Sequence, residues 1–194
     1  VGNFYMWKYA GLNSDGEWVI YDKNGEYKAG MDATDEDMYV VGNGLPKFTA
    51  SWSNYLKYKN LDLSIYFRGA FGFEIFNIHE FYYGIPGMTS NVMKTAYTKN
   101  ANIKENPLVC DYFIERGDYL KLDMVTIGYT IPLVSKYFDS VRFSLTGKNL
   151  FTLTSFSGVD PSPYSTNGLT PGATGSRNYY PTCRQFLAAV QIAF

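Results

Sequence analysis

Apolar and polar residues alternate along several stretches of the chain, and the longest such run covers residues 61–75. Its odd positions are mostly large and apolar: Leu61, Leu63, Ile65, Phe67, Phe71, Phe73 and Ile75. Its even positions include three charged residues, Asp62, Arg68 and Glu74. A period of two indicates a β-strand with two unlike faces. A strand of this length with one apolar and one charged face is typical of a transmembrane barrel, because strands of soluble sandwiches usually have about five or six residues.

Further stretches have the composition or the alternation of strands. They cover residues 1–10, 46–59, 118–131, 140–154 and 184–194. A tight reversal around Asn60 joins the strand before it to residues 61–75 in a long hairpin. In residues 118–131 the apolar side chains change from even to odd positions, which predicts a β-bulge near Asp123 and Met124. We therefore expect an all-β chain that supplies about six antiparallel strands.

The charged side chains on the polar faces of these strands are candidates for the lining of a hydrated lumen. We expect this position for Asp62, Arg68, Glu74, Arg142 and Lys148. The first three follow one another at intervals of six residues, or about 20 Å at ~3.3 Å per residue. That spacing makes a concerted acid–base pair among them improbable.

The carboxy-terminal strand ends the chain on an apolar, aromatic pattern. Its bulky positions are Phe186, Val190, Ile192 and Phe194, and smaller or more polar residues lie between them. A tilted strand needs about 9–11 residues to cross a bilayer. A terminal aromatic residue on such a strand resembles the signal by which outer-membrane barrels are recognised for assembly. We expect these four residues to form that signal.

The connections between the predicted strands alternate between long and short. Residues 11–45, 76–117 and 155–183 are long, whereas the reversal at Asn60 and the segment 132–139 are short. Outer-membrane barrels place long loops outside the cell and short turns in the periplasm. Within the first long loop, Asn24-Gly25 predicts a small hairpin with a type I′ turn. A helical turn or two is expected in residues 91–99.

Composition and charge narrow the function classes. Aromatic residues make up 18% of the 194 residues, which suits the aromatic girdles of a membrane barrel. No stretch approaches ~18 consecutive apolar residues, so a transmembrane helix is excluded. The net charge of −1 gives no electrostatic reason to expect nucleic acid as a partner. The chain begins at Val1 without a signal peptide, and we expect a mature chain or a fragment of a longer protein.

No catalytic, metal or cofactor site is predicted. The single histidine, His79, and the two cysteines, Cys110 and Cys183, are too dispersed for a metal centre. A disulfide between the two cysteines and two unrelated thiols are both open alternatives. No nucleophile or phosphate-binding motif is present, and the chain is not expected to be an enzyme.

Aromatic residues in the long loops are candidates for contacts with a substrate or a partner protein. They are Tyr82, Tyr83, Tyr164, Tyr179 and Tyr180. Tyrosine rings can stack on the apolar faces of sugars and are common in protein interfaces. Packing within the loops, or a place in an aromatic girdle, is the alternative role for these side chains.

Several stretches, in order along the chain, together resemble one family. They are Gly42–Phe48, Tyr58–Phe67, Glu115–Pro132, Thr146–Thr154 with Gly158–Pro161, and the aromatic carboxy-terminus. They are similar to the carboxy-terminal part of SusC/RagA-type TonB-dependent transporters from the outer membrane of Bacteroidetes. The resemblance extends over residues 1–194. No single motif is specific by itself, whereas the ordered series is.

This resemblance implies a 22-stranded barrel with a plugged lumen, powered through TonB and assembled by the barrel-assembly machinery in contact with outer-membrane lipid. It also implies a SusD-like surface lipoprotein that captures oligosaccharides or peptides. The plug, the TonB-contacting segment and the amino-terminal part of the barrel are not among the 194 residues. Six strands cannot close into a conducting barrel, so this part alone is not expected to transport anything.

Other classes of protein stay open at this point. A soluble or surface-exposed β-sandwich that binds glycans is the main alternative. A passive porin, or a membrane-barrel enzyme such as a phospholipase, is another, although the enzyme lacks a plausible catalytic set. The sequence does not identify the substrate.

Overall fold

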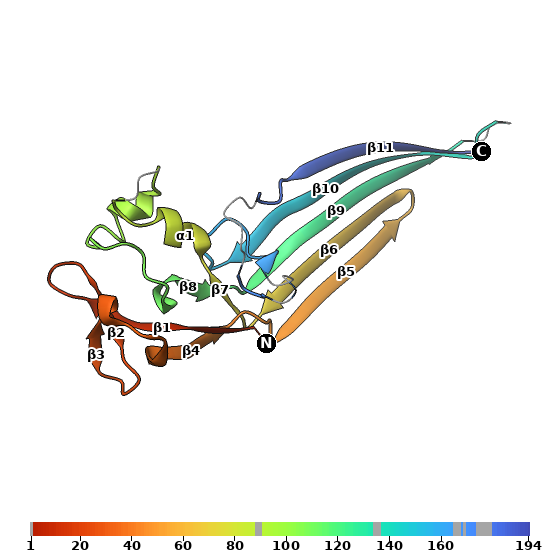
Figure 1. Ribbon diagram of the computed structural model, residues 1–194. Coiled ribbons are helices and arrows are strands. Elements are labelled where there is room, and N and C mark those ends of the chain that lie inside the picture. The colour runs from red at the N-terminus through yellow and green to blue at the C-terminus, as the bar shows by residue number, and fades with distance from the viewer. Residues whose placement is uncertain (1, 88–90, 134–136, 165–167, 169, 174–179) are drawn as a thin grey trace.

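The computed structural model describes residues 2–194 except 88–90, 134–136, 165–167, 169 and 174–179. Its largest element is an antiparallel sheet of five long strands in the order β11-β10-β9-β6-β5 (Figure 1). The strands are β5 (Phe48–Tyr58), β6 (Leu61–Phe71), β9 (Tyr119–Pro132), β10 (Ser140–Thr154) and β11 (Gln185–Ala193). Successive long strands are neighbours in this sheet, which we name the long sheet.

Two smaller sheets and short helices complete the described part of the chain. One sheet has the order β3-β2-β1-β4, and the other pairs β7 with β8. The strands are β1 (Asn3–Leu12), β2 (Trp18–Tyr21), β3 (Tyr27–Ala29), β4 (Met38–Asn43), β7 (Glu74–Phe76) and β8 (Ile114–Arg116). The helices are α1 (Ile78–Tyr83) and the 3₁₀ turns η1 (Gly30–Asp32), η2 (Asp35–Asp37), η3 (Lys94–Tyr97) and η4 (Asp111–Phe113).

The small sheets and helices gather at one end of the long sheet, which we name the loop end (Figure 1). The opposite end carries the short reversals. There Tyr58 pairs with Leu61 across the two-residue turn, and the backbone N–H of Leu133 donates to the carbonyl of Asp139 at 3.0 Å. The carboxy-terminus lies at the same end (Figure 1). This arrangement matches the alternation of long and short connections in the sequence.

Most of the buried apolar residues of the described chain lie in two clusters at the loop end, where the long connections fold over one another. One cluster consists of Trp18, Phe81, Ile85, Ile103, Cys110 and Phe113. The other consists of Ala70, Phe73, Ile75, Tyr119, Phe156 and Tyr164. The second cluster takes residues from β6, β7, β9 and the connection after β10, so it attaches the loops to the long sheet.

The predicted β-bulge is present in β9. Leu122 pairs with Phe67 and Met124 pairs with Tyr66, so Asp123 is an extra residue opposite β6. The extra residue shifts the alternation by one position, which is the change of phase seen in the sequence.

The strand expected over residues 61–75 is shorter than predicted, because β6 ends at Phe71. After it, the backbone N–H of Gly72 donates to Asp118 at 2.5 Å. Phe73 and Ile75 then enter the second core cluster and are almost fully buried. The alternation continues beyond Phe71 because β7 is also a strand, in a different sheet.

The first predicted strand is present as β1, but it pairs with β2 and β4 and not with the long sheet. The described residues therefore supply five strands to the long sheet, compared with about six in the prediction. The small hairpin is also present, as β2 and β3. Its turn is not of type I′, because only Gly25 of the pair Asn24-Gly25 has a positive φ, at 84°. A helical turn expected within 91–99 is present as η3.

The two cysteines are free thiols and form no disulfide. Cys110 is fully buried in the first core cluster, whereas Cys183 is exposed. Of the two alternatives left open by the sequence, the unrelated thiols are correct.

Candidate functional site on the polar face of the long sheet

The long sheet has one apolar and one polar face. Residues that pair across neighbouring strands lie on the same face, and the register pairs apolar residues with apolar ones and polar residues with polar ones. The apolar face carries Phe48, Trp52, Leu56, Leu63, Ile65, Phe67, Leu120, Val125, Ile127, Tyr129, Phe143, Leu145, Phe151, Phe186, Val190 and Ile192. Many of these side chains are about half exposed, for example Trp52 at 53% and Leu145 at 55%. A contiguous exposed apolar surface on this scale is typical of contact with lipid or with another protein.

The polar face carries hydroxyl groups and paired charges. Thr126 and Thr146 lie opposite each other with their hydroxyl oxygens 2.8 Å apart. Of the five residues predicted to face a lumen, Asp62, Arg68, Arg142 and Lys148 lie on this face. The face is therefore polar along its length, although its charges are mostly neutralised within the sheet.

Asp62 of β6 and Arg142 of β10 form a two-point ion pair across the intervening strand β9. The Nε–Oδ1 distance is 3.0 Å and the Nη2–Oδ2 distance is 2.6 Å. The pair passes over Gly128 of β9, where an added Cβ would lie 2.2 Å from Nη2 and 2.6 Å from Asp62. Glycine at this position is thus what allows two strands that do not touch to be joined by their side chains.

Arg68 and Asp123 form a second ion pair, with Nε 2.9 Å from Oδ2. The bulge described above supplies the carboxylate, because Asp123 is the extra residue of β9 opposite β6. Sequence reasoning located the bulge and the arginine but did not connect them. The signal present in the sequence was a charged residue, Asp123, at a predicted bulge, together with Arg68 on another predicted strand.

Lys121 is a third charged residue of the polar face, and it is 1% exposed. Its Nζ lies 2.8 Å from the Thr182 hydroxyl and 3.4 Å from Oδ2 of Asp160. Asp160 also accepts hydrogen bonds from the hydroxyls of Thr182, at 2.5 Å, and Ser162, at 2.7 Å. Burial alone would raise the pKa of Asp160, but these hydrogen bonds and the lysine charge outweigh it and hold the pKa below its usual value.

Glu74 does not lie on the polar face, contrary to the prediction. It belongs to β7, and its carboxylate accepts a hydrogen bond from the backbone N–H of Asn43 at 2.8 Å. The reason is the early end of β6, which removes Glu74 from the alternation of that strand. Lys148 lies on the polar face of β10 and is exposed.

The candidate loop tyrosines have different surroundings. Tyr164 is 4% exposed and packs against Phe156, so packing within the loops accounts for it. Tyr82 and Tyr83 are half-buried in α1, and Tyr82 packs on Phe81. Tyr180 is 87% exposed, and Tyr179 lies outside the described residues. Among the described candidates, Tyr180 has the most accessible ring.

The residues of the expected assembly signal all lie in or just after β11. Phe186, Val190 and Ile192 share the apolar face, and the ring of Phe194 packs 5.4 Å from that of Phe138. Within the described chain β11 pairs only with β10, so its other edge is open. The geometry of this strand suits both membrane contact and pairing with a further strand.

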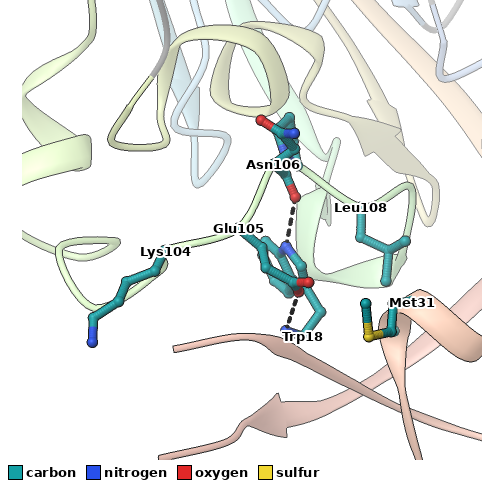
Figure 2. A pocket seen from close by; sticks show the side chains of 8 residues that line it. Trp18, Met31, Lys104, Glu105, Asn106 and Leu108 are labelled. Atoms are coloured by element: carbon teal, nitrogen blue, oxygen red, sulfur yellow. Dashed lines mark hydrogen bonds between the residues drawn. The ribbon is translucent and has the colours of Figure 1, made fainter. Parts of the chain in front are cut away.

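A cleft of about 390 Å³ lies at the loop end between η1 and residues 104–108 (Figure 2). Trp18 forms its floor and is held by two hydrogen bonds, from its indole Nε1 to the Asn106 carbonyl at 2.8 Å and from its backbone N–H to Glu105 at 2.7 Å. Met31 lies at the rim and is 78% exposed. This apolar rim beside Lys104 and Glu105 is a candidate protein contact.

In the part of the chain that the structure describes, no group of three or more histidine, cysteine or acidic side chains could hold a metal ion. The described helices are also too short and too polar for any of them to span a membrane.

Comparisons with known proteins find similarity to proteins of one kind. It is 28% identical over 185 residues to TonB-dependent receptor P3 of Formosa agariphila, covering 83% of this chain and 18% of that protein. It is 29% identical over 197 residues to TonB-dependent receptor P26 of the same organism, covering 90% of this chain and 19% of that protein. The chain thus spans less than a fifth of the length of these curated relatives. No family model matches it.

Solved structures show the same fold. The RagAB peptide importer in its 'closed-closed' state aligns with 99% of this chain and 23% of its own, with a TM-score of 0.77 and 21% identity. Its 'open-open' state aligns with 99% and 22%, with a TM-score of 0.74 and 20% identity. The resemblance to SusC/RagA-type TonB-dependent transporters is confirmed by these comparisons. The relatives are receptors and an importer, which agrees with the prediction that the chain is not an enzyme.

Proposed function

We propose that this chain is the carboxy-terminal part of the barrel of a SusC/RagA-type TonB-dependent transporter in the outer membrane of a Gram-negative bacterium. In this proposal the long sheet is a section of the barrel wall. Its apolar face contacts lipid, its polar face lines the lumen, and its loop end lies outside the cell. The longer protein imports a nutrient, and this chain supplies wall, lining and outer loops.

The observation that carries the proposal is the two-faced long sheet. Exposed aromatic and aliphatic side chains cover one face of all five strands, while ion pairs and hydroxyl groups cover the other. A soluble sandwich would bury the apolar face against a second sheet. The described residues leave it uncovered, and a bilayer is the environment that suits it.

Partners and cargo follow from the relatives as part of the proposal. The cargo is an oligosaccharide or a peptide, and the similar RagAB protein is a peptide importer. A SusD-like lipoprotein contacts the loop end, where Tyr180 and the cleft beside Trp18 offer exposed rings and an apolar rim. TonB acts through the part of the protein that is not included in these 194 residues. The barrel-assembly machinery recognises β11 together with Phe194 at the carboxy-terminus.

Fractionation and uptake test this proposal together. The longer protein should be found in the outer membrane and should require detergent for extraction, whereas a soluble glycan-binding sandwich would not. Cells that carry the gene should accumulate fluorescein-labelled peptides or glucose oligomers, and cells that lack it should not. Collapse of the proton-motive force should stop uptake, because TonB needs it. Uptake that continues without the proton-motive force would indicate a passive porin.

A further inference from the structure

A segment after β10 folds back at the loop end of the long sheet (Figure 1). We name its described residues 156–164 and 171–173 the strap. Phe156 and Tyr164 of the strap pack in one cluster with Ala70 of β6 and Tyr119 of β9. Ala70 and Tyr119 are cross-strand partners on the polar face. The strap therefore lies on that face and covers two neighbouring strands.

The far end of the strap reaches the approach to β5. The carbonyl of Tyr164 accepts a hydrogen bond from the N–H of Gly172 at 3.0 Å, and the carbonyl of Gly172 accepts one from Phe76 at 2.9 Å. Pro171 lies directly against Gly44, where an added Cβ would be 2.0 Å from the proline carbonyl oxygen. Since Gly44 precedes β5, the described parts of the strap contact β9 and β6 at one end and the connection before β5 at the other.

The middle of the strap is fixed to the sheet by the buried charge of Lys121. This lysine belongs to β9, whereas its partners Asp160 and Thr182 belong to the connection between β10 and β11. A buried charge without a partner is costly, so a substitution that removes Lys121 disfavours the position in which Asp160 is buried against the sheet. The ion pair thus connects the strap to the wall at a residue that lies, in the chain, between the two aromatic residues of the strap, Phe156 and Tyr164.

We propose that the strap is a fixed constriction of the passage along the polar face, and that Lys121 and Asp160 are positioning residues that set its width. The proposal rests on the proposed function, in which this face lines the transport path. A fixed element is favoured over a moving lid because three kinds of anchor coincide. The aromatic cluster, the backbone hydrogen bonds of Gly172 and the buried ion pair would all have to break together.

Cysteine labelling in the longer protein tests whether the strap covers the wall. In a Cys183→Ser background, Ala70→Cys places a thiol beneath the strap, and a small membrane-impermeant maleimide is applied to intact cells. Labelling should be slow with Lys121 present. It should rise on the order of tenfold with Lys121→Met, which corresponds to about 1.4 kcal/mol lost from the anchored state. Lys148→Met is the matched control, because it removes an exposed lysine from the same face.

Fast labelling of Ala70→Cys with Lys121 in place would contradict the position of the strap over the polar face. Equal labelling in the Lys121→Met and Lys148→Met variants would contradict the role of Lys121 in holding the strap. If Lys121→Met does not assemble, Asp160→Asn serves as the second variant, because it removes the same ion pair and keeps the side-chain size. Assembly is checked by surface exposure of the protein in each variant.

Uptake of labelled peptides of fixed length with side chains of increasing width, and of linear and branched glucose oligomers of equal size, tests the constriction itself. The width limit should increase with Lys121→Met and stay unchanged with Lys148→Met. An unchanged limit, together with a released strap in the labelling experiment, would overturn its role as a constriction. Absence of uptake by the unaltered protein would contradict the proposed function instead, while the labelling result would still decide whether the strap is anchored.

Discussion

Asp62 and Arg142 join two strands that are not neighbours, and their ion pair crosses the backbone of Gly128 in the strand between them. Any side chain at position 128 would occupy the space of the pair. The charges and the glycine therefore form one unit, although 80 residues separate the charges in the sequence.

We expect Gly128→Ala to break this pair even though it removes no charge. Loss of the pair should lower the free energy of unfolding by about 1–3 kcal/mol, in the range for charged groups left without a partner. Asp62→Asn should have a similar effect. Thermal unfolding of the detergent-solubilised longer protein measures both changes.

A double-mutant cycle provides the control for this prediction. In an Arg142→Ala background the pair is already absent, so Gly128→Ala should cost only a few tenths of a kcal/mol. If the cost of Gly128→Ala is the same in both backgrounds, the glycine is required for another reason and the link to the ion pair is wrong.

Arginine substitutions on β6 should distinguish its two faces. Ile65→Arg and Phe67→Arg place a charge on the apolar face and should each cost ~2–4 kcal/mol if they lie near the midplane of the bilayer. Ser64→Arg is the matched control, because its side chain lies on the polar face beside Tyr55 and Thr126. Yield of folded protein in the outer membrane is the measurement, and equal tolerance of all three would refute the assignment of the faces.

The anchoring of the strap should depend on pH through Asp160. The pKa of this carboxyl is lowered in the folded protein, so the carboxylate stabilises the folded state fully above its unfolded-state pKa of about 3.9. The stabilisation is lost as the pH falls through the lower folded-state value. Pepsin cleavage at Phe156 and Tyr164 should therefore be rare at pH 5 and increase well below pH 4.

Asp160→Asn should remove this transition, because the amide does not titrate. Cleavage at the two aromatic residues should then vary with pH only as the activity of pepsin itself varies, which a site outside the strap would report. A transition that persists in the Asp160→Asn variant would assign the pH dependence to another group.

The two cysteines should differ sharply in reactivity. Burial raises the pKa of the Cys110 thiol to about 12 and removes it from solvent, whereas Cys183 is exposed. Because the thiolate is the reactive form, N-ethylmaleimide at neutral pH should modify Cys183 alone in the folded protein and both residues after denaturation. Cys183→Ser should abolish labelling within these 194 residues of the folded protein, as measured by peptide mapping, and rapid labelling of Cys110 would contradict the buried position.

Local patterns in the sequence predicted those parts of the fold that depend on a single strand. The alternation of β6, the bulge at Asp123 and the reversal before Leu61 are all visible as changes of period or as turn residues. The polar and apolar faces follow from the same alternation, and four of the five charged residues expected on the polar face lie there.

Contacts between segments far apart in the chain were not predictable in this way. Lys121 has the spacing of an ordinary polar-face residue, and nothing near it indicates Asp160. Glu74 continues the alternating pattern of β6 in the sequence, so it was expected on the polar face, but it belongs to β7 in another sheet. The stretch Gly158–Pro161 is part of the family resemblance. Its role in holding the strap could not be predicted from the sequence, because it depends on Lys121 in β9.

The position of the strap also has a consequence for the shape of the wall. A connection between the residues after β10 and those before β5 is a chord across the arc of the long sheet. The length of a chord limits the curvature of its arc, so the anchors of the strap restrain how far this section can flatten. In the proposed barrel, we expect loosening of Pro171 from Gly44 to change the direction in which the open edge of β5 meets the next strand.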